Sequence, residues 1–113
     1  MTKNIDIEID KGSIWSIGIV MIQPTGIPLD LTGFTGKCQI RRYKTGAESI
    51  IADVLVTIDP DPRTGKVSLF LDDTITEKFK FKIAYYDLEL TDSFEFTRRV
   101  LKGKVFLDQE VTI

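Results

Sequence analysis

Asp87 and Glu89 are the two residues of this sequence whose spacing comes closest to that of a catalytic acid and base. Both lie in the segment YYDLELTDSFEF (residues 85–96), in which apolar and acidic residues alternate. On a β-strand, side chains two positions apart point to the same face, and their Cα atoms are about 6.5–7 Å apart. Because the two carboxyl groups of inverting glycosidases are about 6.5–9.5 Å apart, this spacing raises the hypothesis of a carboxylate enzyme.

The residues that follow the acidic pair favour a structural role for it instead. The sequence DSF (92–94) predicts a tight turn, which brings Arg98 and Arg99 opposite or diagonal to the two acids. A nearby arginine favours the ionised form of a carboxyl group, whereas a general acid must hold its proton near neutral pH. We therefore interpret Asp87, Glu89, Arg98 and Arg99 as cross-strand charge pairs.

Other routes to catalysis lack the residues that they need. The chain has no histidine and one cysteine, Cys38, so neither a Ser-His nor a Cys-His pair is available. It has no glycine-rich phosphate loop and no Gly-x-Ser-x-Gly motif, and it lacks the ligands that zinc prefers. We expect no enzymatic activity, no catalytic or cofactor-binding residue and no cofactor, with Cys38 as a structural residue.

Two acidic loops are the candidates for a metal ion. Asp59 with Asp61, and Asp72 with Asp73, offer oxygen ligands, of which calcium takes about six to eight. The first loop lacks the glycine and the terminal glutamate of an EF-hand loop, and its prolines explain it as a turn. The sequence therefore predicts no metal site, and calcium at either loop stays an open question.

Aromatic residues offer a binding function in place of catalysis. Exposed aromatic rings stack on sugars and anchor protein interfaces. Trp15, Tyr43, Tyr85 and Phe94 are the candidate contacts for a protein partner or a glycan. The alternative is that such rings complete the core or cover a sheet edge.

The elements that must position these residues are expected to be strands of a single β-sandwich domain, residues 1–113. Period-two alternation of apolar residues predicts strands at residues 5–9, 14–23, 37–43, 50–58, 67–71, 81–91, 96–102 and 105–107. One helical turn is expected within DDTITEKF (72–79), with Asp73 or Thr74 as its N-cap. This pattern specifies an all-β, antiparallel, Ig-like β-sandwich of about seven to eight strands, with at most one short helical turn.

Irregularities are expected at three places in the strands. In the strand at 81–91 the apolar residues change from odd to even positions, which predicts cover on both faces at the start of the strand or a bulge near Ala84. Gly103 is a candidate bulge in the last strand. Both parities are apolar at residues 14–23, which indicates a strand covered on both sides or one with a side facing a partner.

Composition and charge argue against several classes of protein. Hydrophobic residues make up 42% and charged residues 28% of the chain, values typical of globular proteins. With 15 basic and 17 acidic residues the net charge is −2, which argues against non-specific nucleic-acid binding. No run reaches the roughly 18 apolar residues of a membrane-spanning helix. We therefore expect neither nucleic acid nor membrane as a partner. The single cysteine and the lack of a signal-peptide pattern fit folding in a reducing cytoplasm.

Short motifs along the chain resemble, in the same order, small β-sandwich modules of tailed bacteriophages. They are KGSIW (11–15), PLDLTGFT (28–35), CQIRR (38–42), YDLELT (86–91) and LKGKVFLDQEVT (101–112). Such modules occur as stand-alone virion proteins, and similar ones lie at the amino end of baseplate upper and receptor-binding-fibre proteins. The chain departs from the family pattern before YDLEL, where the family often has a glycine and this sequence reads KFKFKIAY.

What the resemblance implies is assembly. It implies a virion structural or adaptor protein of the tail, baseplate, collar or capsid surface, made in the bacterial host cytoplasm and built into the particle. The expected partners are other virion proteins, with a homo-oligomer in the particle, and the family brings no catalytic residues. The alternative function is a carbohydrate-binding module that uses exposed aromatic residues.

Overall fold

The computed structural model describes residues 2–43 and 49–108, and most of these lie in strands. The strands are β1 (Lys3–Asn4), β2 (Ile7–Asp10), β3 (Trp15–Val20), β4 (Thr35–Arg41), β5 (Ile50–Ile58), β6 (Lys66–Leu71), β7 (Ile83–Thr91) and β8 (Thr97–Asp108). A short 3-10 helix, η2 (Pro62–Thr64), precedes β6, and a helical turn, α1 (Asp73–Thr76), follows it. The prediction of an all-β fold is confirmed.

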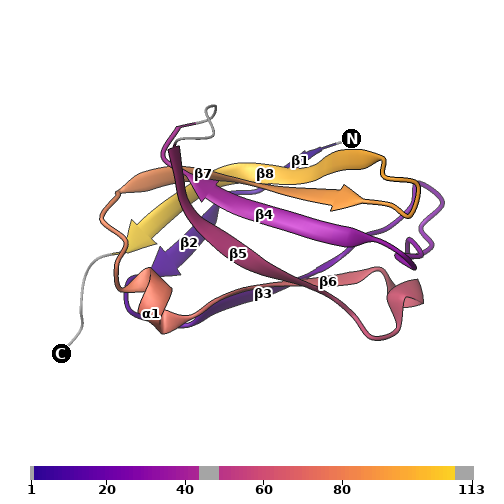
Figure 1. Cartoon of the computed structure of the whole chain (residues 1–113), viewed down its shortest axis with the longest axis horizontal. Helices are drawn as coiled ribbons and strands as arrows, with labels where there is room; N and C mark the ends of the chain where they lie inside the picture. Colours follow the sequence, from indigo (N-terminus) through magenta and orange to yellow (C-terminus); the bar gives the residue numbers. More distant parts are fainter. Residues whose placement is uncertain (1, 44–48, 109–113) are drawn as a thin grey trace.

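The strands form one curled sheet that folds into two layers (Figure 1). The strand order is β1-β8-β7-β4-β5-β6-β3, and β2 also pairs with β8. In Figure 1, β8, β7 and β4 lie in the upper layer, and β3 and β6 lie in the lower layer. β5 joins the layers, because residues 50–54 pair with β4 and residues 55–58 pair with β6. The inner faces of the two layers therefore enclose a common core.

The amino-terminal strands run parallel to β8, whereas the other ladders are antiparallel. Between β1 and β2 the ladder is interrupted at Ile5 and Asp6. The N–H of Ile5 donates to the carbonyl oxygen of Lys102 at 2.8 Å, and the N–H of Lys104 donates to Asp6 Oδ1 at 2.9 Å. The Asp6 carboxylate thus replaces a backbone acceptor, which keeps the amino-terminal segment bonded along β8.

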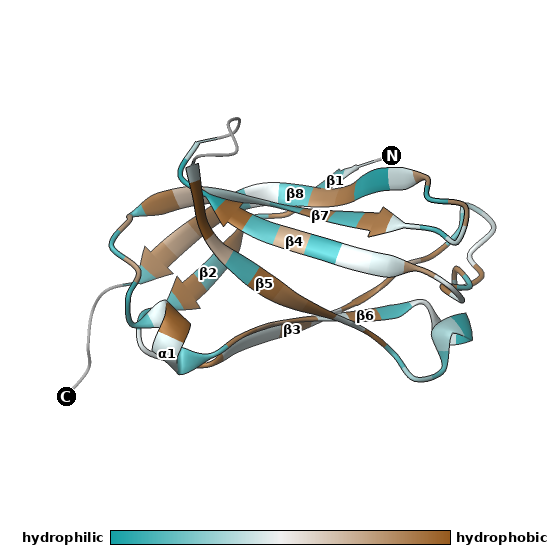
Figure 2. Cartoon of the chain, viewed as in Figure 1, coloured by the Kyte–Doolittle hydropathy of each residue, from teal (hydrophilic) through white to brown (hydrophobic). Residues whose placement is uncertain are grey.

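Strand alternation builds the core between the layers. Its most deeply buried apolar side chains are Ile9, Leu31, Ile40, Val67, Leu69, Leu71, Ala84, Leu88 and Val105. In Figure 2, hydrophilic and hydrophobic residues alternate along β4, as expected of a strand with one face in the core. No helix among the described residues is long and apolar enough to cross a membrane.

The start of the helical turn differs from the prediction. Asp72 is the N-cap of α1, and its Oδ1 accepts a hydrogen bond from the N–H of Asp73 at 2.9 Å. The predicted caps, Asp73 and Thr74, are therefore wrong by one or two positions. The backbone of Asp72 is extended, as an N-cap requires, whereas Asp73 already belongs to the helical turn.

The predicted bulges at Ala84 and Gly103 are also wrong, and so is cover on both faces at the start of β7, where Ile83 is 47% exposed. Ala84 is fully buried in regular pairing with Val105, and the register shift between β7 and β8 lies instead between Leu88 and Glu89. The parity slip has another cause: Phe81 precedes β7 and packs against Phe79, with 5.1 Å between ring centroids.

Gly103 is a regular residue of β8 that pairs with Tyr86. It must be glycine because a Cβ there would overlap the carbonyl group of Ile5. The same carbonyl oxygen accepts a hydrogen bond from the Tyr86 hydroxyl. The glycine therefore allows a close approach of two strands rather than a bulge.

Candidate functional site

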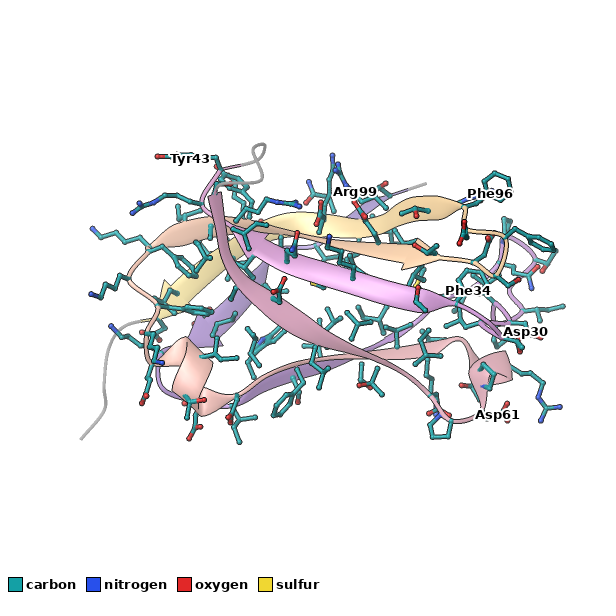
Figure 3. The ribbon with its side chains drawn as sticks, viewed as in Figure 1. Asp30, Phe34, Tyr43, Asp61, Phe96 and Arg99 are labelled. Atoms are coloured by element: carbon teal, nitrogen blue, oxygen red, sulfur yellow. The ribbon has the colours of Figure 1, made fainter. Side chains whose placement is uncertain are left out.

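A hollow of about 440 Å³ lies over β8, β7 and β4, and we call it the basic hollow. Its basic residues are Arg41, Arg99, Lys102 and Lys104, its acidic residues are Asp6 and Asp87, and its aromatic residues are Tyr43, Tyr85 and Tyr86. In Figure 3, the labelled Tyr43 and Arg99 both lie along the upper side of the molecule, on the outer face of the upper layer. The amino-terminal segment also lines the hollow, through Asn4 and Asp6.

The strand register explains why these residues meet. Two cross-strand rows, each running from β4 through β7 to β8, are Gln39–Asp87–Lys102 and Arg41–Tyr85–Lys104. Between the rows, Ile40 pairs with Tyr86, and both residues are buried in the core. Strand alternation therefore places both polar rows on the outer face of the upper layer.

Asp87 is the centre of the polar network in the basic hollow. Its side chain is only 11% exposed, and its Oδ2 lies 3.1 Å from Arg41 Nη1 and 3.3 Å from Arg99 Nε. Arg41 Nη2 donates to Gln39 Oε1 at 2.8 Å, and Gln39 Nε2 donates to Asp53 Oδ1 at 2.9 Å. This chain of contacts crosses β8, β7, β4 and β5 and holds both guanidinium groups beside one carboxylate.

The four residues predicted to form charge pairs have different surroundings. Asp87 and Arg99 form an ion pair, and Glu89 lies opposite Arg99 in the ladder of β7 and β8. Among the residues that the structure describes, neither Glu89 nor Arg98 forms an ion pair. The sequence prediction missed Arg41. Its parity places it on the outer face of β4, but nothing in the sequence shows that β4 lies beside β7.

The four aromatic candidates lie in three different places. Tyr43, which is 63% exposed, and the half-buried Tyr85 both line the basic hollow. Phe94 is 79% exposed in the turn between β7 and β8. Its neighbour Phe96 lies at the opposite end of the molecule from Tyr43 in Figure 3. Trp15 is half-buried against the core, so of the four candidates only the two tyrosines share a concave surface.

Two buried titratable groups near the hollow are chemically inert at neutral pH. Burial raises the pKa of the Tyr86 hydroxyl to about 12, and this hydroxyl donates to the Ile5 carbonyl oxygen. Burial, followed by the charge of Asp87, raises the pKa of the Cys38 thiol to about 12. A thiol acts as a nucleophile through its thiolate, so Cys38 is not poised for catalysis.

The predicted oxygen-rich loops use their carboxylates for local contacts. Asp59 Oδ1 accepts from the N–H of Asp61 at 2.9 Å, and Asp61 Oδ1 lies 3.1 Å from Arg63 Nε. The side-chain hydrogen bond from Arg63 lowers the pKa of Asp61. Asp72 caps α1 through the N–H of Asp73. These contacts explain both loops as turns and caps.

A third acidic group was not predicted from the sequence. Carboxylate oxygens of Glu8, Asp10 and Asp108 lie within 4.8 Å of one another. They meet because Asp10 pairs with Asp108 in the parallel ladder of β2 and β8. Parallel pairing of the two ends of the chain leaves no local signal in the sequence. Nothing beyond the acids themselves points to an ion there.

A second candidate surface is the outer edge of β3, which we call the β3 edge. β3 ends the sheet, and no described strand pairs with its outer side. Its sequence, WSIGIV, contains neither charge nor proline. Trp15, Ile17 and Ile19 are half-buried, whereas Ser16, Gly18 and Val20 are exposed. The prediction that this strand is covered on both faces is therefore wrong. The other predicted alternative, a strand with one side facing a partner, remains.

Apolar side chains surround the β3 edge. Ile14, Val20 and Ile22 are 60%, 47% and 60% exposed. On the same outer face, Leu55 of β5 pairs with Phe70 of β6. Such a group of exposed apolar side chains is typical of a surface that binds another protein.

The chain matches no protein-family model, and no curated protein matches its sequence. The resemblance to phage β-sandwich modules therefore stays a prediction from the sequence motifs. The basic hollow and the β3 edge are the two surfaces of the described residues that are candidates for binding.

Proposed function

We propose that this chain is a non-enzymatic structural or adaptor protein of a bacteriophage particle, in the tail, baseplate, collar or capsid surface. The open, uncharged β3 edge is the observation that carries the assembly part of this proposal. The phage setting comes from the motifs that resemble virion modules. The protein acts by binding other subunits, including further copies of itself.

The contrast between the two edges of the sheet supports assembly through β3. An edge strand presents unpaired N–H and C=O groups that can pair with another strand, and charged residues on an edge oppose such pairing. At the other edge, β1 and β2 carry Lys3, Glu8 and Asp10. β3 carries no charged residue. The β3 edge is thus the one suited to accept a strand from another chain.

The occupant that fits the β3 edge is β3 of a second copy. A twofold contact places a strand antiparallel to its own sequence, so a charged residue near the centre of the strand would lie near its identical partner. β3 has none, and antiparallel self-pairing therefore meets no like-charge repulsion. Ile14, Val20 and Ile22 would lose exposed apolar area, which favours association. Pairing of this kind yields the homo-oligomer expected of a particle component.

Native mass spectrometry of the full chain tests the proposed contact. Gly18→Lys places a charge on the β3 edge, at a position where an added Cβ meets open space. Thr57→Lys is the matched control, because Thr57, Ser68 and Gly18 lie in one cross-strand row. We expect a dimer or larger oligomer for the wild type and for Thr57→Lys, and a monomer for Gly18→Lys. A monomeric wild type, or an oligomer that survives Gly18→Lys, would contradict assembly through β3.

The phage setting has a separate test. Mass spectrometry of purified particles, from a phage that encodes this chain, should find stoichiometric copies of it. Particles that lack the protein would refute a virion role, whatever the oligomeric state of the isolated chain.

A carbohydrate-binding module is a second candidate function, and the basic hollow is the observation that favours it. Tyr43 and Tyr85 line a concave, polar surface on which a sugar ring can stack. A glycan array probed with the wild type and with Tyr43→Ala tests this function, and Phe94→Ala serves as the control outside the hollow. Binding that Tyr43→Ala loses and Phe94→Ala keeps would support it. A flat array for the wild type would remove it.

A further inference from the structure

We infer that the basic hollow binds an acidic saccharide, a sugar ring that carries a carboxylate. This inference deepens the second candidate function and rests on it. It concerns a surface on β8, β7 and β4, distinct from the β3 edge, so assembly and sugar binding need not compete.

The charge of the hollow is opposite to that of the whole chain. The net charge of the protein is −2, yet four basic and two acidic side chains line the hollow. Asp87 is already shared by two arginines. Asp6 accepts a hydrogen bond from the backbone N–H of Lys104. A recess with an excess of one charge focuses the local field, which here attracts an anion.

Hydrogen-bond donors are left over after the internal contacts are made. Arg99 meets Asp87 through Nε, and among the described residues its two Nη groups have no partner. The side chains of Lys102 and Lys104 form no hydrogen bond or ion pair with another described residue, and the Arg99 side chain is 49% exposed. Asp87 thus holds the guanidinium group of Arg99 at Nε and leaves its two Nη groups available to a ligand. A fork of this kind binds a carboxylate through two parallel hydrogen bonds.

Tyrosine rings beside these donors indicate a ligand that has a ring as well as a charge. Tyr43 is largely exposed at the hollow, and Tyr85 lies in the same row as Lys104. The volume of about 440 Å³ falls within the range of about 300–1,000 Å³ that is usual for small-ligand sites. An extended acidic peptide would satisfy the cations but would not use the tyrosine faces. A carboxylated sugar uses both.

NMR titration of the ¹⁵N-labelled full chain tests the inference. The probes are trigalacturonate, the neutral trisaccharide galactotriose, inorganic phosphate and a pentaglutamate peptide. We expect trigalacturonate to shift the backbone amides of Arg99, Lys102 and Lys104 and to bind at least about tenfold more tightly than the other probes. Arg99→Gln should weaken trigalacturonate binding by about tenfold or more. Arg98→Gln is the matched control, since Arg98 is adjacent but outside the hollow, and it should bind like the wild type.

Each other outcome has a distinct meaning. Equal binding of trigalacturonate and galactotriose would overturn the acidic specificity and keep the carbohydrate-binding function. Binding of phosphate or pentaglutamate as tightly as trigalacturonate would overturn the choice of a sugar as ligand. If trigalacturonate does not bind, the inference is overturned; if the glycan array is flat as well, the carbohydrate-binding function is overturned with it. If Arg98→Gln and Arg99→Gln weaken trigalacturonate binding equally, general surface charge binds the sugar rather than the hollow, and the inference is overturned.

Discussion

Asp87 on β7 and Arg41 on β4 form an ion pair with 3.1 Å between Asp87 Oδ2 and Arg41 Nη1. The two residues are 46 positions apart in the chain and meet because β4 and β7 are neighbours in the sheet. The same carboxylate oxygen lies beside Arg99 of β8. One acidic side chain therefore links three strands and also orients the cations of the basic hollow.

Removal of the Asp87 charge should destabilise the fold. Asp87→Asn keeps the size of the side chain but leaves Arg41 and Arg99 without their anionic partner. Because both arginines are partly exposed, we expect the free energy of unfolding to fall by about 1–3 kcal/mol, less than for a fully buried pair. Urea titration followed by circular dichroism measures this change. Glu89→Gln on the same strand face is the control, and we expect it to change the free energy of unfolding by no more than about 0.5 kcal/mol. Equal losses of stability in the two variants would contradict a special role for Asp87.

Gly103 should tolerate no side chain. A Cβ at this position would overlap the Ile5 carbonyl and crowd the Tyr86 ring, so Gly103→Ala should push the amino-terminal segment away from β8. We expect a loss of about 2–4 kcal/mol in the free energy of unfolding, typical of overpacking and a broken buried hydrogen bond. Gly18→Ala is the matched control, because a Cβ there meets open space. Thermal unfolding of the two variants compares them directly, and similar melting temperatures would show that the amino-terminal strands can shift without cost.

Strands formed by local pattern could be predicted from the sequence. β5 has the bounds predicted for it, residues 50–58, because period-two alternation is bounded by clear turn residues. In β6, the alternating apolar residues that predicted a strand at 67–71, Val67, Leu69 and Leu71, are 0%, 0% and 1% exposed. Short-range signals of this kind depend on neighbours in the chain, which the sequence shows directly.

Features that depend on contacts between distant segments could not be predicted. The parallel pairing of β1 and β2 with β8 joins the two ends of the described chain, and no local pattern encodes it. Arg41 was missed for the same reason, since its role depends on β4 lying beside β7. Gly103 was assigned to a bulge because the sequence does not show that Ile5 approaches it.

Acid should destabilise the protein through three surface carboxyls. Asp30, Asp61 and Asp72 each accept a side-chain hydrogen bond from the residue two positions later, which lowers the pKa of each carboxyl from its ordinary value of 3.8. A carboxyl group whose pKa is lower in the folded than in the unfolded chain stabilises the fold while it is ionised. This stabilisation is present above pH 3.8 and is lost as the pH falls below 3.8 through the lower folded pKa values.

The pH dependence can be assigned with a single substitution. Asp72→Asn keeps an oxygen that can cap α1 but removes the titrating group. Urea titrations at several pH values between about 5 and 2.5 should give a smaller loss of stability on acidification for this variant than for the wild type. Parallel curves for the two proteins would show that Asp72 does not contribute to acid unfolding.

Cys38 should resist thiol reagents in the folded protein. Its side chain is 2% exposed on β4, and burial together with the nearby Asp87 charge raises the pKa of the thiol to about 12. At pH 8 the folded protein should therefore react with a disulfide reagent such as DTNB only when the strands around Cys38 open, whereas the urea-unfolded chain should react at once. If opening limits the reaction, Asp87→Asn should label faster than the wild type, because it weakens the contact between β4 and β7. Rapid labelling of the folded wild type would show that Cys38 is accessible and would refute its assignment as an inert core residue.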